Sequence, residues 1–132
     1  MQHLEDLHQE RLFNWAKTKV IHLEGLGGFC LSNYLYAIPN GGKRGIREAA
    51  RLKKQGVKAG VSDVHCPLPC NGFNGLWIEM KKPIIKGKAK PRVSESQKDW
   101  LRRMNSIGHK AVVAYGVVEA KAAIESYFSL SV

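Results

Sequence analysis

The chain has 132 residues, of which 44% are hydrophobic, and a formal net charge of +10. This length predicts a single domain over residues 1–132, and the apolar content excludes a wholly disordered chain. The sequence contains no apolar run near the ~20 residues that cross a bilayer, and its first residues do not have the character of a secretory signal. We therefore expect a soluble protein without membrane contact.

The first predicted helix spans residues 3–18, where apolar side chains recur with helical spacing at Leu4, Leu7, Leu12 and Trp15. Two short apolar stretches follow within residues 20–38. Residues 39–42 have the sequence Pro-Asn-Gly-Gly, which predicts a turn. A second helix is predicted over residues 45–55, and Gly56 is the residue type that commonly ends a helix.

Residues 61–66 and 76–82 predict two strands that form a hairpin. A basic loop over residues 83–93 precedes a helix over residues 94–106, and residues 109–115 predict a buried strand. A final helix has an apolar face made by Ala120, Ala123, Ile124, Tyr127 and Phe128. This order predicts an α/β (α+β) fold in which helices flank a mixed central sheet.

Positive charge is concentrated in two stretches of the chain. Residues 43–58 carry seven bases and one acid, and residues 81–103 carry nine bases and two acids. Such clusters favour a polyanionic partner, because contacts between bases and phosphates release condensed counterions. A solvated basic surface explains the charge equally well. A membrane surface fits less well, because neither cluster forms one continuous amphipathic helix rich in Trp or Phe.

Three cysteines, Cys30, Cys66 and Cys70, cannot all pair within one chain. Free thiols are the expectation for an intracellular composition of this kind. His65 lies beside Cys66, but structural zinc usually takes four ligands in two close pairs, and the second pair is missing. We therefore expect no structural zinc.

The second predicted strand carries the residues with chemical potential. Side chains alternate across a strand, so Glu79 and Lys81 share one face, and the hairpin brings Asp63 opposite Glu79. Two carboxylates and an ammonium group are costly to bury on an apolar sheet without purpose. Carboxylate oxygens suit Mg²⁺ or Mn²⁺, and Lys81 would then orient the attacking water and stabilise the transition state. The alternative is a surface ion pair between Glu79 and Lys81.

Gln97 is predicted to share a helix face with Trp100, Leu101 and Met104. An inward-pointing glutamine requires partners, which a water or phosphate at a metal site would supply. The competing interpretation is a capping box in which Ser94 and Gln97 close the start of the helix. The sequence leaves both roles open.

Taken together, these segments resemble the VRR-NUC (virus-type replication-repair nuclease) family of the PD-(D/E)xK nuclease superfamily. The resemblance covers most of residues 1–128. The matching segments are residues 38–44 (Ile-Pro-Asn-Gly-Gly-Lys-Arg), 60–63 (Gly-Val-Ser-Asp), 76–81 (Leu-Trp-Ile-Glu-Met-Lys), 94–97 (Ser-Glu-Ser-Gln), 108–113 (Gly-His-Lys-Ala-Val-Val) and 119–120 (Glu-Ala). Ser62 departs from the family pattern, in which a proline is more usual, but that position supplies no ligand.

The resemblance implies a restriction-endonuclease-like core and assigns roles to the residues that match its motif. Asp63 and Glu79 correspond to the metal-binding acids, Lys81 to the catalytic lysine and Gln97 to an accessory active-site residue. The backbone carbonyl of Met80 is implied as a further metal ligand.

The family often adds a glutamate from the first helix to this site. Glu5 fits that role better than Glu10, because Glu5 lies nearer the apolar face of the predicted helix.

The activity implied by the resemblance is metal-dependent, structure-selective DNA cleavage, similar to that of Holliday-junction resolvases in replication, recombination or repair. Such an enzyme would act as a homodimer on branched DNA in the cytoplasm of a bacterial or phage-infected host cell. A candidate dimer surface is the apolar stretch 29–38, although an ordinary core strand explains it better. The expected phosphate contacts are Lys43, Arg44, Lys86, Lys88, Lys90 and Arg92.

Two other functions remain open. One is a catalytically silent nucleic-acid-binding module, against which the intact Asp63, Glu79 and Lys81 set argues. The other is a nuclease that acts on RNA or on free DNA ends.

Overall fold

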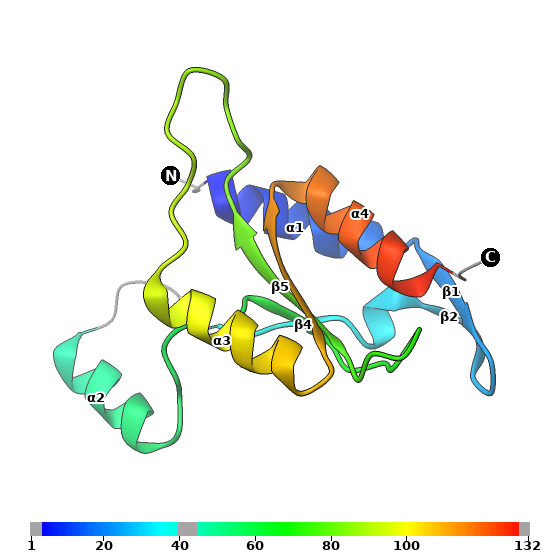
Figure 1. Ribbon diagram of the computed structural model, residues 1–132, viewed down its shortest axis with the longest axis horizontal. Coiled ribbons are helices and arrows are strands. Elements are labelled where there is room, and N and C mark those ends of the chain that lie inside the picture. The colour runs from blue at the N-terminus through cyan, green and yellow to red at the C-terminus, as the bar shows by residue number, and fades with distance from the viewer. Residues whose placement is uncertain (1–3, 40–44, 130–132) are drawn as a thin grey trace.

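The computed structural model describes residues 4–39 and 45–129, in which helices surround a central sheet (Figure 1). The first half of the chain forms α1 (Leu4–Ala16), β1 (Val20–Leu23), β2 (Gly27–Cys30), the 3-10 helix η1 (Leu31–Asn33), β3 (Tyr36–Ala37) and α2 (Ile46–Lys54). The second half forms β4 (Val64–Cys66), β5 (Leu76–Lys81), α3 (Glu95–Ser106), β6 (Lys110–Tyr115) and α4 (Val117–Phe128). None of the helices in the described ranges is long and apolar enough to cross a membrane.

The main sheet has the strand order β3-β4-β5-β6, and the hairpin of β1 and β2 forms a separate two-stranded sheet. Neighbouring strands of the main sheet are antiparallel except β5 and β6, which are parallel. The predicted mixed sheet flanked by helices is therefore confirmed. Because β5 lies between β4 and β6, its side chains occupy the middle of the sheet.

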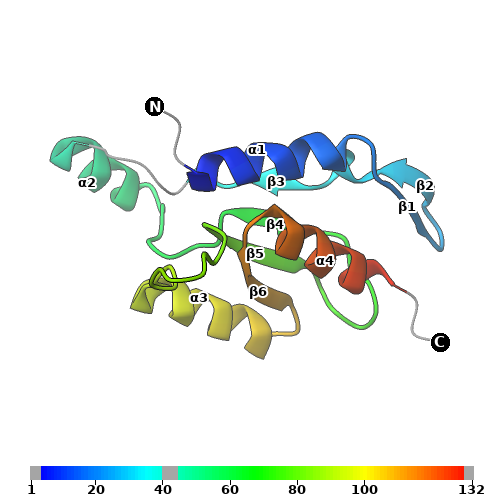
Figure 2. The same ribbon diagram turned by 90° about the horizontal axis from the view of Figure 1, so that it is seen from above.

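Helices cover both faces of this sheet (Figure 2). α1 and α4 pack against each other and against one face, and α3 packs on β5 and β6 from the opposite side. The first face forms the hydrophobic core, in which Leu12 of α1, Ile78 and Met80 of β5 and Ile124 of α4 are each fully buried. The alternation along β5 explains this arrangement, because Ile78 and Met80 point toward the core while Glu79 between them points toward α3.

The β4–β5 hairpin differs from its prediction at one end. β4 begins at Val64, three residues after the predicted start, although the register that pairs Val64 with Ile78 is the predicted one. The strand starts later because of the Asp63 side chain, whose Oδ2 accepts a hydrogen bond from the backbone N–H of Met80 at 2.8 Å. The carboxylate of Asp63 thus binds a donor that a longer ladder would use, and the strand pairing ends there.

α2 was predicted over residues 45–55, and the structure confirms a helix that ends before Gly56, whose φ is +96°. No residue of α2 is buried, and the helix stands away from the sheet in both views (Figures 1 and 2). The chain returns to the body at Gly60, where φ is +87° and an added Cβ would lie 2.3 Å from the carbonyl oxygen of Ser96. A glycine is therefore required where this segment packs on the first turn of α3.

Candidate active site

The end of β5 and the first turn of α3 bring Glu79, Lys81 and Gln97 into one hydrogen-bonded group. Lys81 Nζ donates to Gln97 Oε1 at 2.9 Å, and Gln97 Nε2 donates to Glu79 Oε2 at 3.3 Å. Lys81 Nζ also lies 4.0 Å from Glu79 Oε2. The Glu79 side chain is 2% exposed and that of Lys81 is 11% exposed, so this is not a solvent-exposed ion pair.

Gln97 forms the capping box and also contacts the polar group on β5, whereas its contact with water or phosphate at a metal site stays a prediction. The capping box is present, because Ser94 Oγ accepts from the Gln97 backbone N–H and Gln97 Oε1 accepts from the Ser94 backbone N–H at 2.8 Å. The same Oε1 atom accepts from Lys81. An amide oxygen has two lone pairs, so one atom can serve both donors. The start of α3 is thereby joined to the polar group on β5.

Asp63 and Met80 meet at the edge where the β4–β5 ladder ends. The Met80 N–H donates to Asp63 Oδ2, which fixes the carboxylate beside β5. In an extended strand the N–H and C=O of one residue point to the same edge, so the Met80 carbonyl is also on the side of Asp63. The next carbonyl, that of Lys81, points the other way and accepts from the Gly116 N–H at 2.9 Å.

The electrostatics of Glu79 reflect burial and a neighbouring acid. Burial first, and then the adjacent carboxyl of Asp63, raise the pKa of Glu79 to about 9, although Lys81 opposes the shift. Glu79 Oε1 is buried and has no hydrogen-bond partner among the described residues. With a pKa of about 9 the Glu79 carboxyl is protonated at neutral pH, and a cation bound between it and Asp63 would favour the ionised form of both acids.

These residues fit a divalent cation that prefers oxygen ligands. Asp63, Glu79 and the Met80 carbonyl are hard oxygen donors, which suit Mg²⁺ or Mn²⁺ and leave positions for water and phosphate. Within residues 4–39 and 45–129, no three His, Cys, Asp or Glu side chains are grouped closely enough to hold a metal by themselves. A metal at this site would therefore depend on the backbone carbonyl and on water or substrate.

Glu5 lies at the N-terminal end of α1 beside this group. Burial, followed by the nearby carboxylate of Asp63, raises the pKa of Glu5, and Lys81 is close enough to oppose the shift. Glu10 is exposed and lies by Asp6 and Phe13 instead. The helix thus directs Glu5 toward the site.

The possible zinc ligands are divided between the two faces of the sheet. Cys66 is buried in the core, where burial raises the pKa of its thiol to about 11. His65, the preceding residue, points to the opposite face and stacks on Trp77 with a centroid distance of 3.8 Å. Side chains of adjacent strand residues cannot converge on one ion.

An aromatic group that was not singled out from the sequence positions α3 on the sheet. Trp77 contacts Trp100 of α3 edge to face at 5.3 Å, stacks on His65, and donates from Nε1 to His109 Nδ1 at 3.2 Å. Trp77 shares the strand face of Glu79, and Trp100 shares the helix face of Gln97. The sequence signal was therefore present: two tryptophans on the faces that also carry the polar group.

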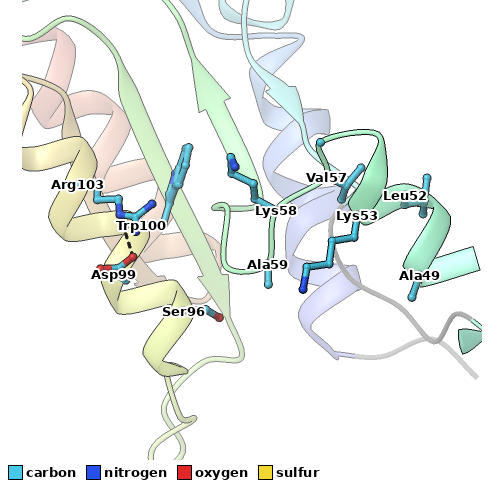
Figure 3. A pocket seen from close by; sticks show the side chains of 11 residues that line it. Ala49, Leu52, Lys53, Val57, Lys58, Ala59, Ser96, Asp99, Trp100 and Arg103 are labelled. Atoms are coloured by element: carbon cyan, nitrogen blue, oxygen red, sulfur yellow. Dashed lines mark ion pairs between the residues drawn. The ribbon is translucent and has the colours of Figure 1, made fainter.

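The predicted phosphate contacts lie in different places. Lys86, Lys88, Lys90 and Arg92 are exposed on the loop between β5 and α3, whereas Lys43 and Arg44 lie outside the described residues. Sequence reasoning did not single out Lys53 and Lys58, which line a cavity of about 690 Å³ between the α2 segment and α3 (Figure 3). Lys53 and Lys58 lie on one wall of this cavity and Arg103 lies on the other. This arrangement could be predicted only if the packing of α2 were known.

A solved structure described as a VRR_NUC domain protein is similar to this chain, with a TM-score of 0.74 and 29% sequence identity. The similarity covers 96% of this chain and 89% of that chain. No family model and no curated protein matches the sequence. The likeness spans nearly all of both chains, and the mixed sheet flanked by helices is consistent with a PD-(D/E)xK core. The similarity to a VRR_NUC domain protein over nearly the whole chain thus supports the resemblance to the VRR-NUC family of the PD-(D/E)xK nuclease superfamily.

Proposed function

We propose that this nuclease-family protein is a metal-dependent, structure-selective DNA endonuclease that hydrolyses phosphodiester bonds, similar to a Holliday-junction resolvase. The observation that carries the proposal is the buried, unpartnered Oε1 of Glu79 beside a second carboxylate and a lysine. A structural ion pair would have its oxygens satisfied from within the protein. An acid left without a partner in a polar group of this kind favours a cation-binding role.

The residues of the chain divide the chemistry between them. Asp63, Glu79 and the Met80 carbonyl would hold the cation, and Glu5 lies near enough to act on its water or on the acids. A bound Mg²⁺ or Mn²⁺ supplies Lewis-acid stabilisation of phosphoryl oxygens and lowers the pKa of coordinated water.

Lys81 would act on the reacting phosphate. An ammonium group has three donors, of which one goes to Gln97 and another faces Glu79, so one remains for the attacking water or a phosphate oxygen. Gln97 keeps the Lys81 amine in place before substrate arrives. A positive charge that needs no reorganisation stabilises a developing negative charge more effectively.

The basic loop and the α2 segment provide charge for the rest of the DNA. Lys86 and Lys90 on one side, and Lys53 and Lys58 on the other, would contact backbone phosphates, which their exposure on the loop and their place in the cavity lining support. A four-way junction has two strands to cut, which suits two symmetry-related sites, so we include a homodimer in the proposal. The stretch 29–38 contributes buried Leu31 and Leu35 to the core, which leaves it a weak candidate for that interface.

Cleavage of matched substrates tests this function. Wild type, Asp63→Asn and the exposed control Glu10→Gln are incubated with a four-way junction, linear duplex, free-ended DNA or RNA, in Mg²⁺, Mn²⁺ or EDTA. We expect paired cuts in the junction with metal, loss of cutting in Asp63→Asn, and no loss in the control. Equal cutting of junction and duplex would indicate a general DNA nuclease, and preference for ends or RNA would replace the substrate assignment.

Two further results would contradict parts of the proposal. Tight DNA binding without cleavage of any substrate would indicate a silent binding module. Light scattering would contradict the homodimer if it found one copy in solution and one copy on the junction while that junction still received paired cuts.

A further inference from the structure

A second cavity adjoins the active site on the side of the basic loop. It has a volume of about 470 Å³ and lies between the N-terminal end of α1 and residues 82–92, where the loop rises beside α1 (Figure 1). Its lining includes Lys81 and Glu5. A ligand in this cavity would therefore be continuous with a phosphate bound at Lys81, and the volume lies within the ~300–1,000 Å³ usual for small-ligand pockets.

Charge on the cavity wall favours an anion. Lys82, Lys88 and Arg92 line the cavity together with Lys81, against the single acid Glu5. Within the described ranges, neither Lys88 nor Arg92 forms an ion pair, so both cations are available to a ligand. Lys and Arg side chains that have no ion-pair partner are suited to bind phosphate.

An apolar wall distinguishes this cavity from a simple phosphate site. Leu4 and Ile85 line it and are 38% and 44% exposed, and Pro83 and Pro91 complete the same lining. Exposed apolar side chains beside unpaired cations favour a ligand that has both a phosphate and a flat apolar part. A nucleotide meets both conditions.

We propose that this cavity binds the nucleotide next to the scissile phosphate, with its phosphate at Lys88 and Arg92 and its base against Leu4 and Ile85. The inference rests on the proposed nuclease function, which it extends to the substrate. Because the cavity has room for one nucleotide and lies between a helix and a loop, that nucleotide is unpaired. The enzyme therefore selects strands whose base beside the cut is unpaired or has been opened from its pair.

Neighbouring residues on the same loop provide matched controls. Lys90 Nζ lies 4.7 Å from the centroid of the Tyr115 ring, and Lys86 is in the turn closed by the Lys88 N–H and the Ile85 carbonyl. Neither lysine lines the cavity. Ile84 is 51% exposed and likewise lies outside the lining, next to Ile85.

Calorimetric titration with thymidine 3′,5′-bisphosphate, without metal, measures the site apart from cleavage. We expect Lys88→Gln with Arg92→Gln to weaken binding about tenfold or more, and Lys86→Gln with Lys90→Gln to leave the affinity for this mononucleotide unchanged. Ile85→Asn should weaken binding of the bisphosphate but not of pyrophosphate, whereas Ile84→Asn should affect neither. Equal affinities of the Lys88/Arg92 and Lys86/Lys90 double variants, or equal effects of the two isoleucine variants, would overturn the proposal.

A cleavage comparison separates this inference from the proposed function. Two substrates differ only in whether the base beside the cut is paired, and the Lys88/Arg92 double variant should lose more activity on the unpaired one. Equal losses on both substrates, with wild type active, would reject the unpaired-nucleotide site and leave the nuclease assignment intact. Inactive wild type with selective bisphosphate binding would reject the nuclease function and retain a nucleotide site.

Discussion

Gln97 Oε1 accepts the Lys81 ammonium at 2.9 Å while the same atom accepts the backbone N–H of Ser94 at 2.8 Å. The position of the lysine is therefore coupled to the start of α3. The helix cap and the candidate catalytic group share one side chain, so a change in either affects the other. This arrangement makes Gln97 a positioning residue whose two roles can be separated by mutation.

We expect Gln97→Ala to lower both stability and cleavage, whereas Ser94→Ala lowers stability alone. Each substitution removes part of the capping box, which stabilises the helix by about 1 kcal/mol. Only Gln97→Ala also frees Lys81, and misplacement of a catalytic group costs about tenfold or more in rate. Urea unfolding and single-turnover cleavage measure the two effects. If Ser94→Ala and Gln97→Ala cleave equally, Gln97 acts only as a cap.

Metal binding should depend on two acids: Glu79 on β5 and Asp63, the residue before β4. Asp63→Asn and Glu79→Gln are each expected to weaken Mn²⁺ binding by more than about tenfold, and Glu5→Gln to weaken it less. Glu10→Gln, an exposed acid of the same helix, is the control. Titration calorimetry gives the affinities directly. Unchanged Mn²⁺ binding in Asp63→Asn would remove that residue from the ligands.

The stability of the fold should fall in acid through His65. Burial first, and then nearby His109, lower the pKa of His65 from 6.5 to about 4. Between these two pH values the unfolded chain binds a proton that the folded chain does not, so stability is present above pH 6.5 and declines as the pH falls toward 4. The limit of this contribution is about 3 kcal/mol.

His65→Phe keeps a ring against Trp77 and should reduce the loss of stability over that pH interval. The exposed His22 provides a matched histidine, and His22→Phe should leave the decline unchanged. Chemical unfolding at a series of pH values gives both curves. A decline in His65→Phe as steep as that of wild type would show that His65 is not the responsible group.

Ser62 should be replaceable without loss of stability. Its side chain is fully buried and its Oγ has no hydrogen-bond partner in the described part of the chain. Removal of an unsatisfied hydroxyl avoids a desolvation cost, so Ser62→Ala should be neutral or stabilising by up to about 1 kcal/mol. Ser94→Ala, which removes a satisfied hydroxyl, should change stability in the opposite direction. A clear loss in Ser62→Ala would mean that its hydroxyl has a bound partner such as water.

The sequence was sufficient for the features that depend on strong periodicity. The alternation along residues 76–81 predicted that Glu79 and Lys81 share a face, and the helical face of Gln97 and Trp100 is the one that packs on the sheet. The register that places Asp63 beside Glu79 also followed from the hairpin.

Other features depend on tertiary contacts that periodicity does not encode. The early end of β4 arises from a side chain of Asp63 that binds a backbone donor, which no strand propensity describes. α2 has an amphipathic sequence but no buried residue, so its apolar spacing did not report where the helix lies. The sequence could not show that Gln97 both caps α3 and contacts Lys81, because one amide oxygen accepts both donors through its two lone pairs.

Cleavage and binding by Lys81→Ala test the central claim most directly. The same four-way junction is given to wild type, Lys81→Ala and Lys17→Ala, an exposed lysine at the other end of α1. We predict that Lys81→Ala loses about 10²–10⁴-fold in metal-dependent rate, keeps its fold and its DNA affinity, and that Lys17→Ala behaves as wild type. Cleavage by Lys81→Ala at the wild-type rate, or loss of DNA binding together with cleavage in a folded variant, would contradict the assignment of Lys81 to the chemical step.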